Sequence, residues 1–117
     1  MKKEAVKKYL DDKKGAVEEY PFGPGAMVYK AGGKIFAIVS IDDDPASISL
    51  KCDPMEAEAL RSEYKGITPG YHLNKKHWNT VVLDGSVPSD LVKEMIDNSY
   101  DLIVKSLSKV DRLHLAS

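Results

Sequence analysis

The sequence has a single cysteine, Cys52, so no disulfide can form within the chain, and this fits a reducing compartment. It also lacks a long apolar run. The longest, from Ile35 to Val39, has the length of a strand and is far too short to cross a membrane. The start of the chain, Met1 to Glu4, lacks the apolar stretch of a signal peptide. Together these absences predict a cytoplasmic location.

No excess of either charge is present, since the formal net charge is −1. This argues against a strongly basic nucleic-acid-binding protein. The charges are nevertheless unevenly distributed. Between Asp42 and Glu63 there are seven acids and two basic residues, whereas Tyr64 to Leu83 holds three lysines, two histidines and no acid. Such asymmetry can orient a polyanion on a nearly neutral protein, and the alternative is an ordinary mixed-charge surface.

A length of 117 residues with 43% hydrophobic residues is sufficient for one domain with one core, spanning residues 1–117. Hydrophobic periodicity and turn signals predict its elements. They are a helix over 3–13, strands over 17–22, 27–31, 34–41 and 46–52, a helix over 53–66, a strand over 78–83 and a helix over 88–107. Hairpin-length connections make most of the sheet antiparallel. The predicted fold class is α+β, a two-layer sandwich of order α-β-β-β-β-α-β-α with helices on one face of the sheet.

Three local patterns support this order. Gly32 and Gly33 stand between two apolar runs, as in a two-residue hairpin whose central positions need positive φ. Asp53 is followed by Pro54 and Glu56, the pattern of a capped helix start. The strand before it alternates between a core-facing and a water-facing set. The first set is Ile48, Leu50 and Cys52, and the second is Ser47, Ser49 and Lys51.

The chain offers little for catalysis or metal binding. Cys52 ends the alternating strand on its apolar side, where a cysteine is usually buried and inert. His72 and His77 lie in a lysine-flanked segment, and nearby positive charge opposes a cation. The Asp42-Asp43-Asp44 run is a better cation candidate, but acids before a proline are typical of an exposed turn. We expect no catalytic residue, metal site or cofactor, and therefore a non-enzymatic module.

The most unusual segment, residues 70–80, follows a predicted turn at Thr68-Pro69-Gly70. It contains two lysines, two histidines, two asparagines and two large aromatic residues. Lysines neutralise phosphates, asparagines pair with base edges, and aromatic rings pack on bases or sugars. The alternative is a solvated loop in which Tyr71 and Trp78 anchor the core. Loops on a rigid scaffold tend to carry function, which favours a binding role.

Several blocks of the sequence carry a resemblance to a known family. They are Tyr20-Pro21-Phe22-Gly23, Gly33 to Ala37, Ser49 to Pro54, Pro69 to Val81 and Ser99-Tyr100. With these blocks in this order across nearly the whole chain, the sequence resembles the MmcQ/YjbR family of small bacterial proteins. The most specific block is Lys75-Lys76-His77-Trp78-Asn79. One departure is a shorter N-terminus, which trims the first helix.

The resemblance implies a CyaY-like, that is frataxin-like, α/β sandwich whose hairpins form a double-wing DNA-binding arrangement, with no catalytic residue and no required cofactor. It gives the DNA-contact role to residues of the 71–79 loop and to one strand residue. These residues are His72, Asn74, Lys75, Lys76, His77, Asn79 and, as a weaker member, Lys51. A frataxin-like fold also invites an iron-binding interpretation. That interpretation expects an acidic first helix, whereas the helix here is rich in lysine, so we discount it.

The leading hypothesis is therefore a DNA-binding module that contacts the phosphates of double-stranded DNA through the basic loop, with the Gly32-Gly33 hairpin as a wing. The alternative is a protein-interaction or small-ligand-binding module that uses the same loop and the adjacent sheet. An apolar pocket beside Trp78 would favour this alternative. A metal-binding domain is the third hypothesis.

Overall fold

The computed structural model describes residues 1–70 and 73–116. Its elements follow the order α1-β1-β2-β3-β4-α2-β5-β6-α3-α4. The helices are α1 (Lys3–Asp11), α2 (Pro54–Glu63), α3 (Ser89–Ser106) and α4 (Lys109–Ala116). The strands are β1 (Val17–Glu19), β2 (Ala26–Ala31), β3 (Lys34–Ser40), β4 (Ser47–Lys51), β5 (Ile67–Pro69) and β6 (Trp78–Val82). No helix within the described ranges is long and apolar enough to cross a membrane.

The strands of the described residues form one six-stranded sheet in the order β1-β2-β3-β4-β6-β5. Every neighbouring pair is antiparallel. The chain leaves the sheet after β4 to form α2, and it returns as the edge strand β5 before β6 pairs with β4. The predicted α+β sandwich with a mostly antiparallel sheet is thus confirmed, and the β5–β6 hairpin forms one edge of it.

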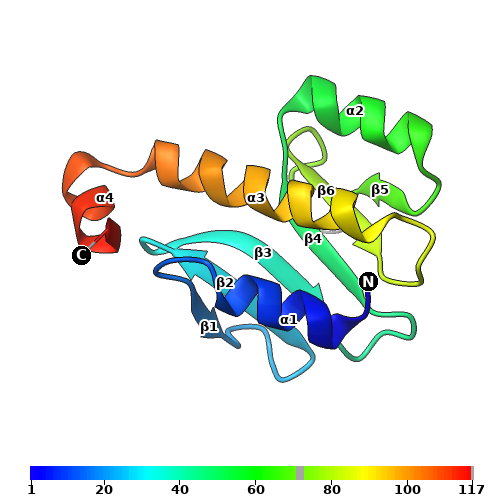
Figure 1. The fold of residues 1–117 in the computed structure, drawn as a ribbon, viewed down its shortest axis with the longest axis horizontal. Helices are drawn as coiled ribbons and strands as arrows, with labels where there is room; N and C mark the ends of the chain where they lie inside the picture. The colour runs from blue at the N-terminus through cyan, green and yellow to red at the C-terminus, as the bar shows by residue number, and fades with distance from the viewer. Residues whose placement is uncertain (71–72, 117) are drawn as a thin grey trace.

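Helices α1, α2 and α3 lie on one face of the sheet (Figure 1). Helix α3 contacts β2, β3 and β4, while α2 contacts β5 and β6. The core fills the space between the two layers, with Val39 and Ile48 from the sheet and Ile96 from α3 all completely buried. Ser99 of α3 links the layers, because its hydroxyl donates to the carbonyl of Phe36 over 2.6 Å. The same oxygen accepts from the backbone N–H of Lys51 at 2.9 Å, so the end of β4 is held in place.

The three local patterns behave as the sequence predicted. Gly32 and Gly33 have φ angles of 57° and 83°, which lie in the left-handed region that a tight hairpin turn requires. The carboxylate of Asp53 accepts hydrogen bonds from the N–H groups of the first turn of α2. On β4, Ile48 and Leu50 are completely buried, whereas the alternate residues face the opposite side of the sheet.

Two elements differ from the sequence prediction. Residues 67–69 form β5 where only a turn was expected; its proline is tolerated because β5 is an edge strand. Helix α4 follows α3 after a break at Leu107, whose ψ of 154° is extended. The hydroxyl of Ser108 accepts from the N–H of Asp111 at 3.1 Å and caps the new helix. The element order predicted from the sequence therefore omits one strand, β5, and one helix, α4. Neither addition changes the two-layer arrangement.

Candidate functional site

The strand register defines a second face of the sheet, opposite the helices, which we call the open face. Ile38 of β3 is paired with Ser49 of β4, and Ser49 is paired on its other side with Thr80 of β6. Side chains alternate along a strand, so these three lie opposite the buried Val39 and Ile48. The hydroxyls of Ser49 and Thr80 are hydrogen-bonded to each other at 2.8 Å. The middle of the open face therefore combines apolar and hydroxyl side chains.

A groove with a volume of about 580 Å³ lies on this open face, and we call it the open-face groove. Its floor comes from the three central strands and consists of Ile35, Ile38, Ser40, Ser47, Ser49 and Thr80. The loop before β2 adds Phe22, whose side chain is 69% exposed, and the β5–β6 loop adds Leu73. The carboxylate-bearing residue in the lining is Asp43. The groove is in the size range of sites that hold small ligands or parts of larger ones.

The described part of the β5–β6 loop, residues 73–77, is held by hydrogen bonds of its backbone. Arg61 of α2 donates from Nη1 to the carbonyl of Lys75 at 2.8 Å. The side-chain oxygen of Asn74 accepts from the N–H of Lys76 at 3.0 Å. The carbonyl of His77 accepts from the backbone N–H that follows β4 at 2.7 Å. These bonds fix the loop at the end of the sheet without using the lysine side chains.

The structure brings most of the predicted contact residues together at this end of the sheet. The exposed or half-buried members of the loop are Asn74, Lys75, Lys76 and His77. Neither loop lysine forms an ion pair with the described part of the chain. Lys51 is half-buried at the end of β4, opposite Trp78 in the register, so both lie on the open face. The remaining predicted member, His72, lies outside the described residues.

Asn79 is the predicted contact residue that the structure does not bring to the surface, because its side chain is completely buried. Its Nδ2 donates to the carbonyl of Ala57 at 3.3 Å, and its Oδ1 accepts from Nη1 of Arg61 at 3.3 Å. Alternate residues of β6 face opposite sides, so Asn79 points toward the helices whereas Thr80 points toward the open face. Asn79 holds Arg61, which in turn holds the loop, and its role is structural.

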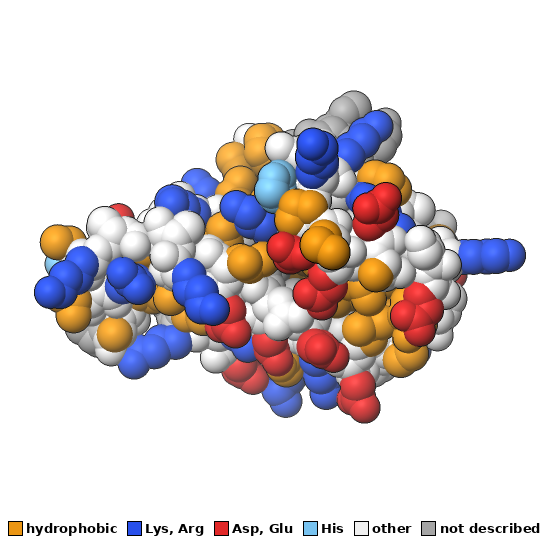
Figure 2. Space-filling model, turned by 90° about the horizontal axis from the view of Figure 1, so that it is seen from above, with side chains coloured by type: hydrophobic (Ala, Val, Ile, Leu, Met, Phe, Trp, Pro, Cys, Tyr) orange, Lys and Arg blue, Asp and Glu red, His pale blue; other side chains and the backbone are white. Residues whose placement is uncertain are grey.

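Charge changes sign between the two ends of β4. Lys51 and the loop lysines lie at one end of β4, and the Asp42–Asp44 turn precedes the other end. Seen from the side of α2 and α3, basic side chains lie around the α4 end on the left and along the upper edge beside a histidine, while most acidic side chains lie in the lower and right-hand part (Figure 2). Lys65, which the sequence groups with the loop lysines, lies instead at the other end of β5, in a hollow with Glu63 and Asp84.

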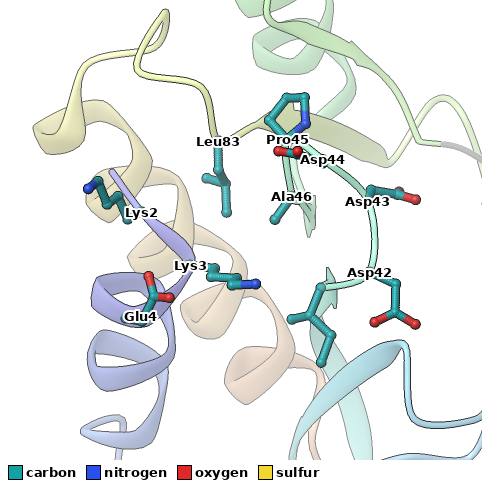
Figure 3. A pocket seen from close by; sticks show the side chains of 10 residues that line it. Lys2, Lys3, Glu4, Asp42, Asp43, Asp44, Pro45, Ala46 and Leu83 are labelled. Atoms are coloured by element: carbon teal, nitrogen blue, oxygen red, sulfur yellow. The ribbon is translucent and has the colours of Figure 1, made fainter.

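The Asp42–Asp44 turn also borders a hollow of about 470 Å³ next to the start of α1. Figure 3 shows Lys3 on the opposite wall, while the carboxylates of Asp42 and Asp43 point in different directions and do not converge. Among residues 1–70 and 73–116, no group of three His, Cys, Asp or Glu side chains could hold a metal ion. The run forms the exposed turn that acids before Pro45 predict.

Cys52 contributes to the site through its backbone and not through its sulfur. The side chain is 6% exposed, and burial, assisted by the carboxylates of Glu56 and Asp53, raises the pKa of the thiol to about 11. Such a thiol is protonated at neutral pH and is a poor nucleophile. The backbone N–H of Cys52, in contrast, is the donor that holds the carbonyl of His77.

Sequence reasoning missed the residues that build the groove, chiefly Phe22, Ile35, Ile38 and Leu73. A signal for two of them exists, because the apolar run over 35–39 gives β3 apolar side chains on both faces, while helices cover only one. Phe22 lies in a turn rich in proline and glycine, which places an aromatic ring at the surface. No sequence pattern indicated a role for Arg61, because it lies on another element and contacts the loop only in the folded chain.

Comparison with known proteins agrees with this architecture. The YjbR family model matches residues 11–102. The uncharacterized protein YbdF of Escherichia coli O157:H7 is 40% identical over 93 residues, which cover 80% of this chain and 76% of that protein. The uncharacterized protein YjbR of Escherichia coli strain K12 is 36% identical over 104 residues, covering 89% of this chain and 88% of that protein.

Solved structures show the same fold. The crystal structure of Deinococcus radiodurans protein DR2400 superposes with a TM-score of 0.92 at 38% identity, covering 98% of this chain and 88% of that chain. A crystal structure of a protein from Pseudomonas syringae superposes with a TM-score of 0.77 at 27% identity, covering 88% of this chain and 99% of that chain. The family match, the identities and the shared fold lead to one conclusion: this chain belongs to the YjbR family.

Proposed function

We propose that this chain is a non-enzymatic DNA-binding module that contacts phosphates through Lys75 and Lys76. The observation that supports the proposal is the contrast within the β5–β6 loop. The backbone of its described part, residues 73–77, is hydrogen-bonded to Arg61 of α2 and to the N–H of Cys52 after β4, while its two lysine side chains are exposed and form no ion pair within the described residues. A segment that is anchored through its backbone and presents cations is suited to phosphate contact.

The surrounding charge limits how DNA can approach. Helix α2 carries the exposed acids Glu56, Glu58 and Glu63, which repel a polyanion from the helix side of the loop. On the other side, Lys51 lies on the open face at the same end of the sheet. We therefore place the phosphate path over the open-face side of the loop. With two or three phosphate contacts the affinity is modest, and it falls by about tenfold or more between 50 and 200 mM salt.

Two further parts of the proposal rest on chemistry and on the sequence. The buried Cys52 thiol has a raised pKa, so the only cysteine is a poor nucleophile and supports a binding module better than an enzyme. A cytoplasmic location fits a protein that meets DNA, and the lone cysteine is in keeping with a reducing compartment.

The test uses the only tryptophan, Trp78, which stands opposite Lys51 on the open face. Short duplex DNA is titrated at low salt while the fluorescence of Trp78 and the anisotropy of the labelled DNA are followed, and salt is then raised. We expect a saturable change that salt reverses. The double variant Lys75→Ala/Lys76→Ala is expected to lose most of the binding.

The matched control is Lys2→Ala/Lys3→Ala, which removes an equally exposed lysine pair outside the loop. It changes the net charge by the same amount and is expected to bind nearly as well as the unchanged chain. Equal losses in the two double variants would mean that net charge alone governs binding. The absence of any fluorescence or anisotropy change at low salt would exclude the proposed function.

The open-face groove favours a second candidate, a module that binds a small ligand or a peptide. Its floor is apolar at Ile35 and Ile38, and Phe22 stands beside it with most of its ring exposed. The ligand hypothesis called for an apolar pocket beside Trp78; the groove is lined by Thr80 of the same strand, and Trp78 is not in its lining. Binding of an uncharged apolar probe that Phe22→Ala abolishes, together with no DNA binding, would support this candidate over the first.

A further inference from the structure

We propose that the open-face groove receives unpaired bases of single-stranded DNA, while the phosphates of that strand lie along Lys51 and the β5–β6 loop. The inference rests on the proposed function and deepens it. It changes the expected substrate from an intact double helix to a strand with exposed bases. Three features carry it: the concave shape of the groove, its mixture of aromatic and hydroxyl groups, and the placement of lysines beyond one end while Asp43 lines the other.

The shape of the groove suits unpaired bases. In a double helix the bases are stacked inside, and only their edges are accessible from the DNA grooves. A recess of about 580 Å³ on the protein cannot reach those edges by itself, whereas it can hold an extruded or unpaired base. Between Ile35 and Ser40 the floor follows β3 for about 17 Å, because a strand rises by about 3.3 Å per residue. The site is thus an elongated groove and not a deep pocket.

The lining offers the contacts that bases need. Phe22 presents a largely exposed ring, and stacking on an aromatic ring is tolerant of base identity. Ile35 and Ile38 supply apolar surface in the floor of the same groove. The hydroxyls of Ser49 and Thr80, which are hydrogen-bonded to each other at 2.8 Å, add polar groups to this lining. Aromatic, apolar and hydroxyl groups therefore meet in one place on an otherwise ordinary sheet.

The charges around the groove favour one orientation of a bound nucleotide. Lys51 lies two residues beyond Ser49 on the same face, about 7 Å along the strand, so it lies just outside the groove, past the residues that line this end. A phosphate is favoured there, beside the loop lysines. Asp43 lines the opposite end, where a carboxylate repels phosphate and accepts hydrogen bonds from the amino groups of bases. The arrangement favours bases with exocyclic amino groups, namely cytosine, adenine and guanine, over thymine.

The experiment compares the affinity of one labelled oligonucleotide in three forms: single-stranded, fully paired, and paired around a short unpaired internal loop. At low salt we expect the first and third forms to bind at least about tenfold more tightly than the second, from the stacking of one or more bases. Phe22→Ala is expected to remove most of this preference and to leave duplex affinity unchanged. A second variant, Ile35→Glu, places a carboxylate in the floor of the groove and is also expected to reduce the preference for unpaired DNA.

The matched control for Phe22→Ala is Met55→Ala, because Met55 is 83% exposed on α2, away from the groove. It should leave all three affinities unchanged. If duplex and single strand bind equally, and only Lys75→Ala/Lys76→Ala weakens them, the inference is overturned and the proposed function stands. If no form of DNA binds, both fail. If free deoxynucleoside monophosphates compete as well as the strand at equal concentration, the site serves free nucleotides and the strand assignment is wrong.

Discussion

The two faces of the sheet carry similar side chains in different surroundings. On the helix face of the central strands, Val39 and Ile48 are completely buried between the layers. On the open face of the same strands, Ile35 and Ile38 are only half-buried and line a groove. The helix face shows how this sequence completes a core, since its buried apolar residues form one cluster with residues of α1 and α3. The open face has apolar residues that the described chain does not fully cover, and this difference points to a binding surface.

The largest expected effect comes from truncating one isoleucine on each face. Ile48→Ala removes a completely buried side chain and should lower the free energy of unfolding by about 3–4 kcal/mol. Ile38→Ala removes a half-buried one on the adjacent strand and should lower it by about 1 kcal/mol or less. Urea denaturation followed by circular dichroism measures both. Equal losses would show that the open face is covered in solution, for example by a second copy of the chain.

The second-largest expected effect is a difference in stability between variants of two asparagines that the sequence analysis assigned to the same contact set. Asn79→Ala leaves the carbonyl of Ala57 and the guanidinium of Arg61 without their amide partner and should cost about 1–3 kcal/mol. Asn74→Ala changes an exposed loop residue and should cost less than about 1 kcal/mol. Thermal and urea unfolding of both variants provide the comparison. A fully stable Asn79→Ala protein that no longer binds DNA would restore Asn79 to the contact surface.

Acid should weaken the packing of α1 on the sheet more than it affects the open face. The hydroxyl of Tyr29 lies 2.6 Å from Oδ1 of Asp11 and 2.9 Å from Oε1 of Glu18, and Nζ of Lys7 lies within 2.9 Å of both carboxylates. Hydrogen bonds from Tyr29 and Lys7 lower the pKa of Asp11, and bonds from Lys7, Tyr29 and Tyr20 lower the pKa of Glu18.

A folded-state pKa below the unfolded value stabilises the protein at neutral pH, and this contribution is lost as the pH falls through the lowered pKa values, below about pH 4. We therefore expect the melting temperature to drop as the pH is lowered below about 4, the ordinary range of carboxyl groups. In Tyr29→Phe the drop should be smaller, because one of the groups that favour the ionised carboxylates is gone. An unchanged pH profile in this variant would contradict the role assigned to Tyr29.

The smallest effect is expected at the proposed binding surface itself. Lys75→Ala/Lys76→Ala and Phe22→Ala alter exposed side chains and should change the free energy of unfolding by no more than about 0.5 kcal/mol. Differential scanning calorimetry checks this. Unchanged stability together with reduced DNA binding would assign these side chains to recognition. A drop of several degrees in melting temperature would show that they support the fold.

Much of the fold followed from local signals in the sequence. The glycine pair at 32–33, the cap at Asp53 and the alternation of β4 each depend on neighbouring residues only, and each is found as predicted. Edge strand β5 was missed because Pro69 and Gly70 are stronger turn formers than strand formers, and only pairing with β6 makes the segment a strand. The start of α4 had a signal in the Ser108-x-x-Asp111 spacing, which the structure uses as a cap.

The candidate site was only partly predictable for a physical reason. The basic character of the loop depends on Lys75 and Lys76 being adjacent in the chain, so the sequence alone identified it. The sequence also grouped Asn79 with the loop, but β6 begins at Trp78, and the strand turns Asn79 toward the helices. Pairing in the sheet, and not proximity along the chain, decided its role.

By itself, the sequence determined the family, the order of most elements, the core-facing residues of β4 and the presence of a basic loop, because periodicity, caps and charge runs act over a few residues. Only the tertiary structure brought Phe22, Ile38, Thr80 and Leu73 into one groove and separated Lys65 from the loop lysines. These relations depend on the register of strands that are distant in sequence, and one residue of register reverses the face on which a side chain lies.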